Sequence, residues 1–134
     1  MLASVILVED KNIISSNSFE KLDARDKISL LLNQCSIPLE IPSDLKYLTK
    51  FAKEKNYTAT QTITEFRNGL IHPKLKNREK VSQIPYEVIT EIYLLGKWYL
   101  ELIILKLFGY EGKYINRTKK QIYTDYEGED VPWK

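Results

Sequence analysis

The sequence predicts an all-α domain, a bundle of four to five helices, and three observations lead to this prediction. Apolar residues recur at helical spacing in several segments, prolines and glycines separate these segments, and residues 86–108 carry the strongest helical pattern. The chain has 134 residues, 43% hydrophobic and 28% charged, which suits one globular domain with a single core. We therefore expect a single domain over residues 1–134, with a short leader at 1–17 and a partly packed or mobile tail at 112–134.

The N-terminal part of the chain contains one undecided segment and one expected helix. Residues 4–8, SVILV, are too few to distinguish a strand from the first turn of a helix. The polar run at 15–18 supplies cap and turn chemistry, and a helix is expected over 19–35. Its expected inner face consists of Phe19, Leu22, Ile28, Leu31, Leu32 and Cys35. Because Cys35 lies on this apolar face, we expect a buried thiol and not a nucleophile, and a lone cysteine excludes an internal disulfide.

A second helix is expected after a proline-containing break. Pro38 and Pro42 must end the first helix, and Ser43 is the expected N-cap of the next one, over residues 44–55. One stripe of this helix is apolar and consists of Leu45, Leu48, Phe51 and Ala52.

A third helix is expected after the threonine-rich turn at 56–61. Its apolar residues at i, i+3 and i+7 are Ile63, Phe66 and Leu70. Gly69 weakens this helix by about 1 kcal/mol relative to alanine. Pro73 disfavours helical dihedral angles at His72, so the helix should end at or just before His72.

The last expected helix is the longest. Residues 74–85 read as a polar, mostly basic connection, and the helix then runs over 86–108. Its second half is apolar nearly all round, which indicates a helix that is central in the core or shared with a partner chain. Gly109 and Gly112 should end it. We expect the carboxylates within 125–133 to belong to a solvated tail.

Several classes of function find little support. The net charge of +2 is too small to indicate nucleic-acid or membrane binding by itself. The longest apolar run, residues 98–108, is shorter than the about 20 residues of a membrane span, and no secretory signal is visible, so a cytoplasmic location is expected. No second carboxylate or histidine lies near Glu65, and no glycine-rich phosphate loop occurs, so neither a metal nor a cofactor is expected.

Residues 65–73, EFRNGLIHP, hold the candidate site. His72 is the only histidine, a residue type that can take or give a proton, and the fork of donors of Arg67 suits phosphate oxygens. Asn68 could orient either group by hydrogen bonding. Residues five apart on a continuous helix differ by about 140°, so the pair could meet only if the helix unwinds between Gly69 and Pro73.

A basic run directly after this segment is the expected RNA-backbone contact. It consists of Lys74, Lys76, Arg78 and Lys80. A purely structural reading stays open, because cations favour the C-terminal ends of helices and lysine runs commonly lie in solvated loops.

Residues 66–74, FRNGLIHPK, resemble the signature of the HEPN superfamily, the higher eukaryotes and prokaryotes nucleotide-binding domains, whose motif is R-polar-x3-H. The order of elements is also similar. A helix pair joined by a proline turn precedes the motif, a long apolar helix with LGKWYLELIILKLFGY follows it, and VPW closes the chain. The nearest group is the C-terminal HEPN domain of ApeA-type anti-phage proteins, and the resemblance covers residues 18–117.

The resemblance implies a homodimer in which two motifs face each other across one cleft, and a metal-independent endoribonuclease of defence, toxin or stress systems. Arg67 would bind the scissile phosphate, His72 would act as general acid or base, and Asn68 would support them, giving 2′,3′-cyclic phosphate and 5′-hydroxyl ends. The implied partners are RNA, a second copy of the chain, and an antitoxin or sensor protein.

The chain departs from the family pattern at two places. Lys74 stands where HEPN toxins often carry a modifiable tyrosine, which leaves such an antitoxin mechanism without support. The leader at 1–17 is much shorter than the N-terminal region of ApeA-type proteins, so we expect a stand-alone relative, a fragment, or a copy without its sensor. The alternative functions are a HEPN-fold module without catalysis that binds RNA, a nucleotide or a protein, and a plain helical dimerisation protein.

Overall fold

The structure is a computed structural model that describes residues 3, 7–8, 14–72, 74–119 and 127–134, and it is mostly helical. The elements are α2 (Ser16–Lys21), α3 (Ala24–Gln34), α4 (Lys46–Lys55), α5 (Ala59–Ile71), α6 (Leu75–Ser82), α7 (Tyr86–Leu107), β1 (Lys113–Tyr114) and β2 (Glu129–Asp130). This confirms the all-α prediction, whereas the described residues form six helices in place of the four to five expected. Most of the undecided segment at 4–8 lies outside the described residues.

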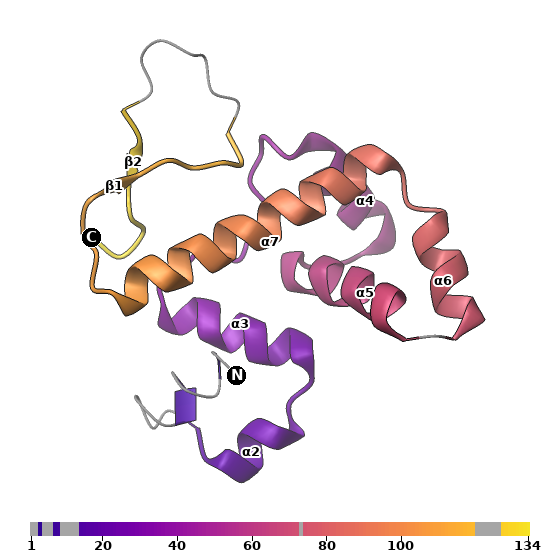
Figure 1. Ribbon diagram of the computed structural model, residues 1–134, viewed down its shortest axis with the longest axis horizontal. Coiled ribbons are helices and arrows are strands. Elements are labelled where there is room, and N and C mark those ends of the chain that lie inside the picture. Colours follow the sequence, from indigo (N-terminus) through magenta and orange to yellow (C-terminus); the bar gives the residue numbers. More distant parts are fainter. Residues whose placement is uncertain (1–2, 4–6, 9–13, 73, 120–126) are drawn as a thin grey trace.

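The long helix α7 runs through the middle of the molecule, and α4 and α5 pack along it (Figure 1). α4 and α5 both contact α7, and α3 packs against α5. α6 follows the C-terminal end of α5 and also packs against α5. The two short strands β1 and β2 form an antiparallel pair at the C-terminal end of α7, with Tyr114 opposite Glu129.

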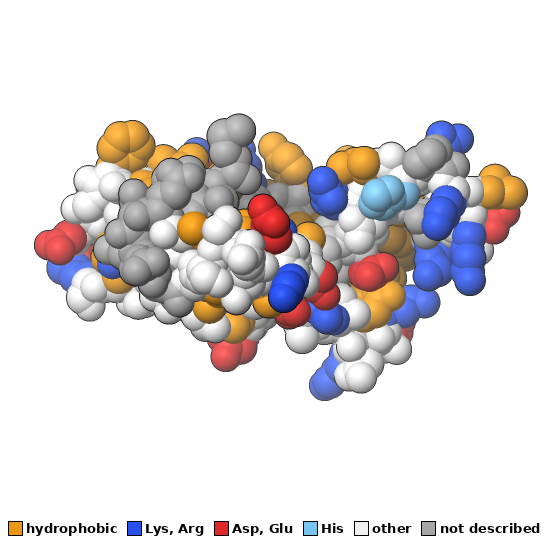
Figure 2. Space-filling model, turned by 90° about the horizontal axis from the view of Figure 1, so that it is seen from below, with side chains coloured by type: hydrophobic (Ala, Val, Ile, Leu, Met, Phe, Trp, Pro, Cys, Tyr) orange, Lys and Arg blue, Asp and Glu red, His pale blue; other side chains and the backbone are white. Residues whose placement is uncertain are grey.

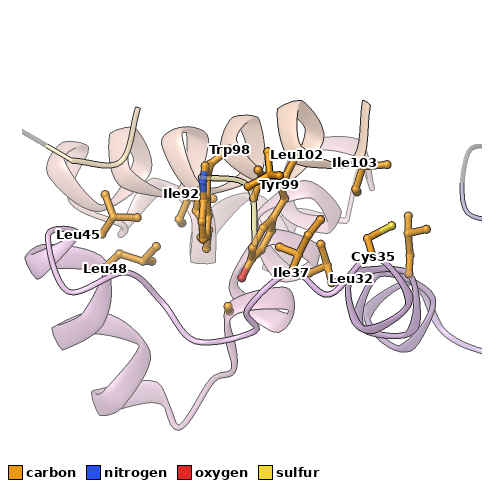
Figure 3. Packing of buried hydrophobic residues seen from close by; sticks show 14 of the residues in the cluster. Leu32, Cys35, Ile37, Leu45, Leu48, Ile92, Trp98, Tyr99, Leu102 and Ile103 are labelled. Atoms are coloured by element: carbon orange, nitrogen blue, oxygen red, sulfur yellow. The ribbon is translucent and has the colours of Figure 1, made fainter. Parts of the chain in front are cut away.

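Side chains from α7 form the centre of the core. Trp98, Tyr99 and Leu102 point toward side chains of α4 and of the segment around Ile37 (Figure 3). The buried hydrophobic residues of the cluster include Leu7, Leu31, Leu32, Cys35, Ile37, Leu45, Leu48, Ala59, Val88, Ile92, Leu95, Trp98, Tyr99, Leu102, Ile103, Tyr114 and Val131. Cys35 is 3% exposed, which confirms the prediction of a buried thiol.

The outer face of α7 remains uncovered. Large apolar side chains on this face are exposed: Tyr86, Tyr93, Leu100, Ile104, Leu107 and the capping Phe108. One face of α7 therefore packs in the core. The opposite, apolar face is not covered by any of the described residues. The end of the helix agrees with the prediction, because Gly109 follows with φ +67°.

Two local predictions about the first half of the chain are wrong. The single helix expected over 19–35 is two helices, because Leu22 is extended and the Asp23 carboxylate accepts the N–H of Asp26 at 2.8 Å as a new N-cap. Ser43 does not cap α4. The Glu91 carboxylate of α7 accepts the Leu48 N–H at 2.5 Å instead, from 43 positions away in sequence.

The buried face of α5 is the expected one only in part, because Ile63 and Phe66 pack against the core and Leu70 does not. Leu70 is exposed, and the buried residues are Ala59, Thr60, Thr62, Thr64 and Gly69. Threonine can be buried here because its hydroxyl is satisfied: Thr62 donates to the Ala59 carbonyl oxygen at 2.6 Å, and Thr60 lies 2.9 Å from the Ser29 hydroxyl of α3. These contacts fix the rotation of α5 and thus the direction in which its motif points.

Candidate functional site

The first motif residue, Arg67, lies on the exposed side of α5. Its guanidinium donates to the Asn68 side-chain oxygen at 3.4 Å, a long and weak hydrogen bond. The described residues place no carboxylate in an ion pair with Arg67. The charge of the guanidinium is therefore available to an anion from outside the protomer.

The second motif residue, His72, caps the C-terminal end of α5. Its backbone is extended, with φ −83° and ψ 121°, which confirms that the helix ends just before it. The His72 N–H donates to the Asn68 carbonyl oxygen at 3.0 Å. The imidazole is exposed and makes no side-chain hydrogen bond with the described residues (Figure 2).

The unwinding that would let the two side chains meet does not occur between Gly69 and Ile71. α5 stays helical through Ile71, so Arg67 and His72 remain five positions apart on one helix and project in different directions. No hydrogen bond joins their side chains. A single protomer therefore presents the two groups at one helix end without bringing them together.

The basic segment after the motif is a helix and not the expected loop. Lys74 is the N-cap of α6 without a side-chain cap bond, and the side chains of Lys76, Arg78 and Lys80 are exposed. Lys76 and Lys80 share a face at i, i+4 spacing, whereas Arg78 points away from that face. Figure 2 shows lysine and arginine side chains gathered beside the histidine, on the side where α6 lies.

Exposed apolar side chains lie next to the motif. Leu70 is 63% exposed, Ile71 56% and Leu75 72%, at the end of α5 and the start of α6. We call these three residues the motif patch. Apolar side chains grouped in this way are common where another surface binds.

The third motif residue, Asn68, borders two cavities. One, of about 250 Å³, lies between α4, α5 and α6, and the other, of about 220 Å³, lies between α5 and the start of α3. Glu65 borders both cavities as well. Sequence reasoning missed these cavities, because residues from two helices form the smaller one and residues from four helices form the larger one.

A separate polar cluster lies at the C-terminal strand pair, where the sequence indicated only a solvated tail. The Glu129 carboxylate accepts the Tyr114 hydroxyl and the Asn116 amide, each at 2.7 Å, and pairs with Lys119. Burial acts to raise the pKa of Glu129, but the hydrogen bonds from Lys119, Tyr114 and Asn116 together lower it below the usual value. The cluster anchors the strand pair to α7, because the Trp98 indole N–H donates to the Tyr114 hydroxyl at 2.9 Å.

Two other kinds of site can be addressed from the described part of the chain. Burial, and to a lesser degree the charge of Glu40, raises the pKa of Tyr99, so its phenol stays protonated and is no acid–base candidate. Among the described residues there is no group of three or more metal-ligating side chains.

None of the described helices combines the length and the apolar character needed to cross a membrane.

The fold and the site define a small helical domain that presents an arginine, an asparagine and a histidine at one helix end beside a basic helix. Residues 1–127 match the family described as the YopA C-terminal domain, and the chain belongs to that family. It is 37% identical over 131 residues to the SPbeta prophage-derived uncharacterized protein YopA of Bacillus subtilis (strain 168). The match covers 96% of this chain and 27% of that relative, so the chain spans about a quarter of the relative's length. No solved structure matches the chain.

These matches leave the resemblance to the HEPN superfamily as a prediction. The helical content agrees with it at the level of fold class. The roles that the resemblance gives to Arg67, Asn68 and His72 are taken up below.

Proposed function

We propose that the domain is a metal-independent endoribonuclease of HEPN type that works as a homodimer in the cytoplasm, in a defence, toxin or stress response. The observation that carries the proposal is the exposure of Arg67 and His72 at one end of α5, directly beside the basic helix α6. An exposed imidazole without a hydrogen-bond partner can exchange protons, and an exposed guanidinium without an ion pair can bind phosphate. The prophage origin in the name of the Bacillus subtilis relative fits a role in conflict between phage and host.

A second copy of the chain would complete the site. Because Arg67 and His72 diverge on one helix, an arginine of one protomer and a histidine of the other are better able to contact the same phosphate. The motif patch supplies apolar surface for such contact beside the motif itself. A two-fold axis at this patch would place the same surface on both sides of the interface and bring two motifs together.

The reaction needs only proton transfer and charge stabilisation. The ribose 2′-oxygen gives its proton to one imidazole and forms a bond to phosphorus while the bond from phosphorus to the 5′-oxygen breaks. The leaving 5′-oxygen takes a proton from the second imidazole of the dimer. The products are a 2′,3′-cyclic phosphate and a 5′-hydroxyl. Arg67 stabilises the charge on the phosphate oxygens, and Asn68, already in contact with Arg67, holds the guanidinium in place.

A module that binds RNA, a nucleotide or a partner protein without cutting RNA is the second candidate. The observation that favours it is the unbroken helix between Arg67 and His72, which leaves a single protomer without an assembled catalytic pair. In either case the exposed apolar face of α7 offers a surface for a sensor or antitoxin protein.

The first experiment incubates purified protein with RNA in EDTA and analyses the ends of the products. We expect cleavage that survives chelation, produces cyclic phosphate ends, and is lost in both Arg67→Ala and His72→Ala. Arg78→Ala is the matched control, because Arg78 is also exposed but lies outside the motif, and it should weaken RNA binding with little change in the rate at saturating RNA. Intact RNA with salt-sensitive binding would favour the second candidate.

The composite site has its own test. Arg67→Ala and His72→Ala are mixed after unfolding and refolding, so that mixed dimers form. Such a dimer retains one arginine and one histidine, from different protomers. Water then replaces the missing second imidazole as the proton donor to the leaving 5′-oxygen, so we expect a small part of the activity to return. A mixture as inactive as its components, in a protein shown to be dimeric by ultracentrifugation, would contradict a site shared across the interface.

A further inference from the structure

The cavity of about 250 Å³ beside the motif has an apolar wall and three aromatic rings. Phe51 and Tyr57 meet edge to face, with ring centroids 6.5 Å apart and planes at 72°, and Phe66 of α5 also lines the cavity. Val81 and Ile84 close it from the side of α6. Unstacked nucleobases bind to aromatic and apolar surfaces of this kind in single-stranded RNA recognition.

The rim of the same cavity consists of polar side chains that have no hydrogen-bond or ion-pair partner among the described residues. Lys55, Lys80, Glu65 and Gln83 border it, and none of their side chains makes a hydrogen bond or ion pair with the described residues. Two ammonium groups can bind phosphates, and a carboxylate and an amide can pair with the edge of a base. A purely apolar ligand would leave these groups without partners.

Asn68 connects this cavity with the two motif side chains. It lines the cavity, its side-chain oxygen accepts from Arg67 at 3.4 Å, and its carbonyl oxygen accepts the His72 N–H at 3.0 Å. The side-chain NH₂ of Asn68 has no partner among the described residues. A base in the cavity would therefore contact the residue that is hydrogen-bonded to both Arg67 and His72.

We propose that this cavity binds one nucleobase of a single-stranded RNA, next to the phosphate held by Arg67. The inference rests on the proposed function, because it gives that site a subsite for the base. The volume suits one planar ring inserted from the surface, with the sugar and phosphate outside at Lys55 and Lys80. The enzyme then selects its cleavage position by the base that fits this cavity.

The test measures binding of oligoribonucleotides in EDTA, on a His72→Ala background that keeps the RNA intact. The probes are oligoadenylate, oligocytidylate and oligouridylate of equal length, with an abasic ribose-phosphate oligomer that carries the same phosphates without bases. We expect at least one base-bearing oligomer to bind roughly tenfold more tightly than the abasic one, the range of a base–aromatic stack. Equal affinity for all four probes would overturn the proposal.

Two variants locate the effect in the cavity. Val81→Phe fills it, and Gln83→Leu removes an exposed amide from its rim, so the second variant remains informative if the first fails to fold. Both should lower affinity for the preferred oligomer toward that of the abasic one and leave abasic binding unchanged. Gln34→Leu, an exposed glutamine that lies outside the described cavities, should change nothing. A base preference that survives in Gln83→Leu and in folded Val81→Phe would place the base elsewhere.

Two further readouts separate related outcomes. A nucleoside monophosphate of the preferred base that binds as tightly as the oligomer would assign the cavity to a free nucleotide and overturn the RNA subsite. Cleavage by the protein with an intact His72 is measured in parallel. Cleavage without base preference would contradict the base-binding subsite and support the ribonuclease proposal. Base-dependent binding without cleavage would support the subsite and contradict the ribonuclease proposal.

Discussion

Replacing Glu129 by alanine should detach the C-terminal strand pair from the long helix. The carboxylate accepts from Tyr114 and Asn116 at 2.7 Å each and pairs with Lys119. Tyr114 and Asn116 are buried, and Tyr114 in turn accepts the Trp98 indole N–H at 2.9 Å. Removing the carboxylate thus removes the acceptor of one hydrogen bond from each of two buried side chains.

The expected loss of stability follows from these contacts. A hydrogen bond to a charged acceptor contributes ~1.5 kcal/mol at the lower end of its range, so two of them give about 3 kcal/mol. The pair with Lys119 adds little, because the lysine side chain is 47% exposed and its charge is screened by water. A loss of about 3 kcal/mol lowers Tm by roughly 10 °C for a domain of this size.

The assay is urea unfolding followed by tryptophan fluorescence, since Trp98 contacts the cluster. Asp130→Ala is the matched control. Asp130 is the adjacent carboxylate on β2, pairs with Lys134 at 2.9 Å and is exposed, so its loss should change the free energy of unfolding by less than about 0.5 kcal/mol. Similar unfolding curves for Glu129→Ala and Asp130→Ala would refute the reasoning.

The same cluster predicts the direction of a pH effect. The pKa of Glu129 is lower in the folded chain than its ordinary value, so its contribution to stability is present above that ordinary value and is lost as the pH falls through the folded pKa. The wild type should lose stability in this acid range more steeply than Glu129→Gln, which has no charge to lose. Parallel curves for the two proteins would contradict the assignment.

Three further predictions concern single positions. Glu91→Ala removes the carboxylate that accepts a backbone N–H in the first turn of α4 at 2.5 Å, and should lower the free energy of unfolding by ~1–2 kcal/mol in urea titrations. Gly128→Ala places a Cβ 2.7 Å from the Tyr114 carbonyl oxygen at a φ of +85°, and should open the strand pair to hydrogen exchange while α7 stays protected. Gly96→Ala meets nothing within 4 Å inside α7 and should raise stability by ~0.5–1 kcal/mol, measured as a higher Tm.

Local chemistry explains the predictions that were confirmed. The long helix at residues 86–108 was predicted from its apolar pattern, and α7 spans Tyr86–Leu107. The end of α5 at His72 was predicted from Pro73, because a proline restricts the residue directly before it. The buried Cys35 was predicted from its place on an apolar face. Each of these features depends on residues within a few positions of one another.

The motif itself was visible in the sequence, but its geometry was not. Arg67, Asn68 and His72 were chosen for their chemistry and spacing, and the structure places all three at one helix end. Unwinding at Gly69, the condition under which the pair could meet, does not occur, because the glycine lies on the buried face of α5 and the helix continues through it. The cavity that Asn68 borders involves α4 and α6, which no local pattern connects with the motif.

The sequence by itself determined the helical class, the long central helix and the position of the candidate motif, because periodicity, prolines and caps act between near neighbours. Only the tertiary structure decided which faces are buried, that Glu91 caps α4, that Glu129 anchors the strand pair, and that a cavity lies beside Asn68. These features join residues that are far apart along the chain. Their free energy comes from contacts that exist only once the helices have packed, so no local pattern in the sequence encodes them.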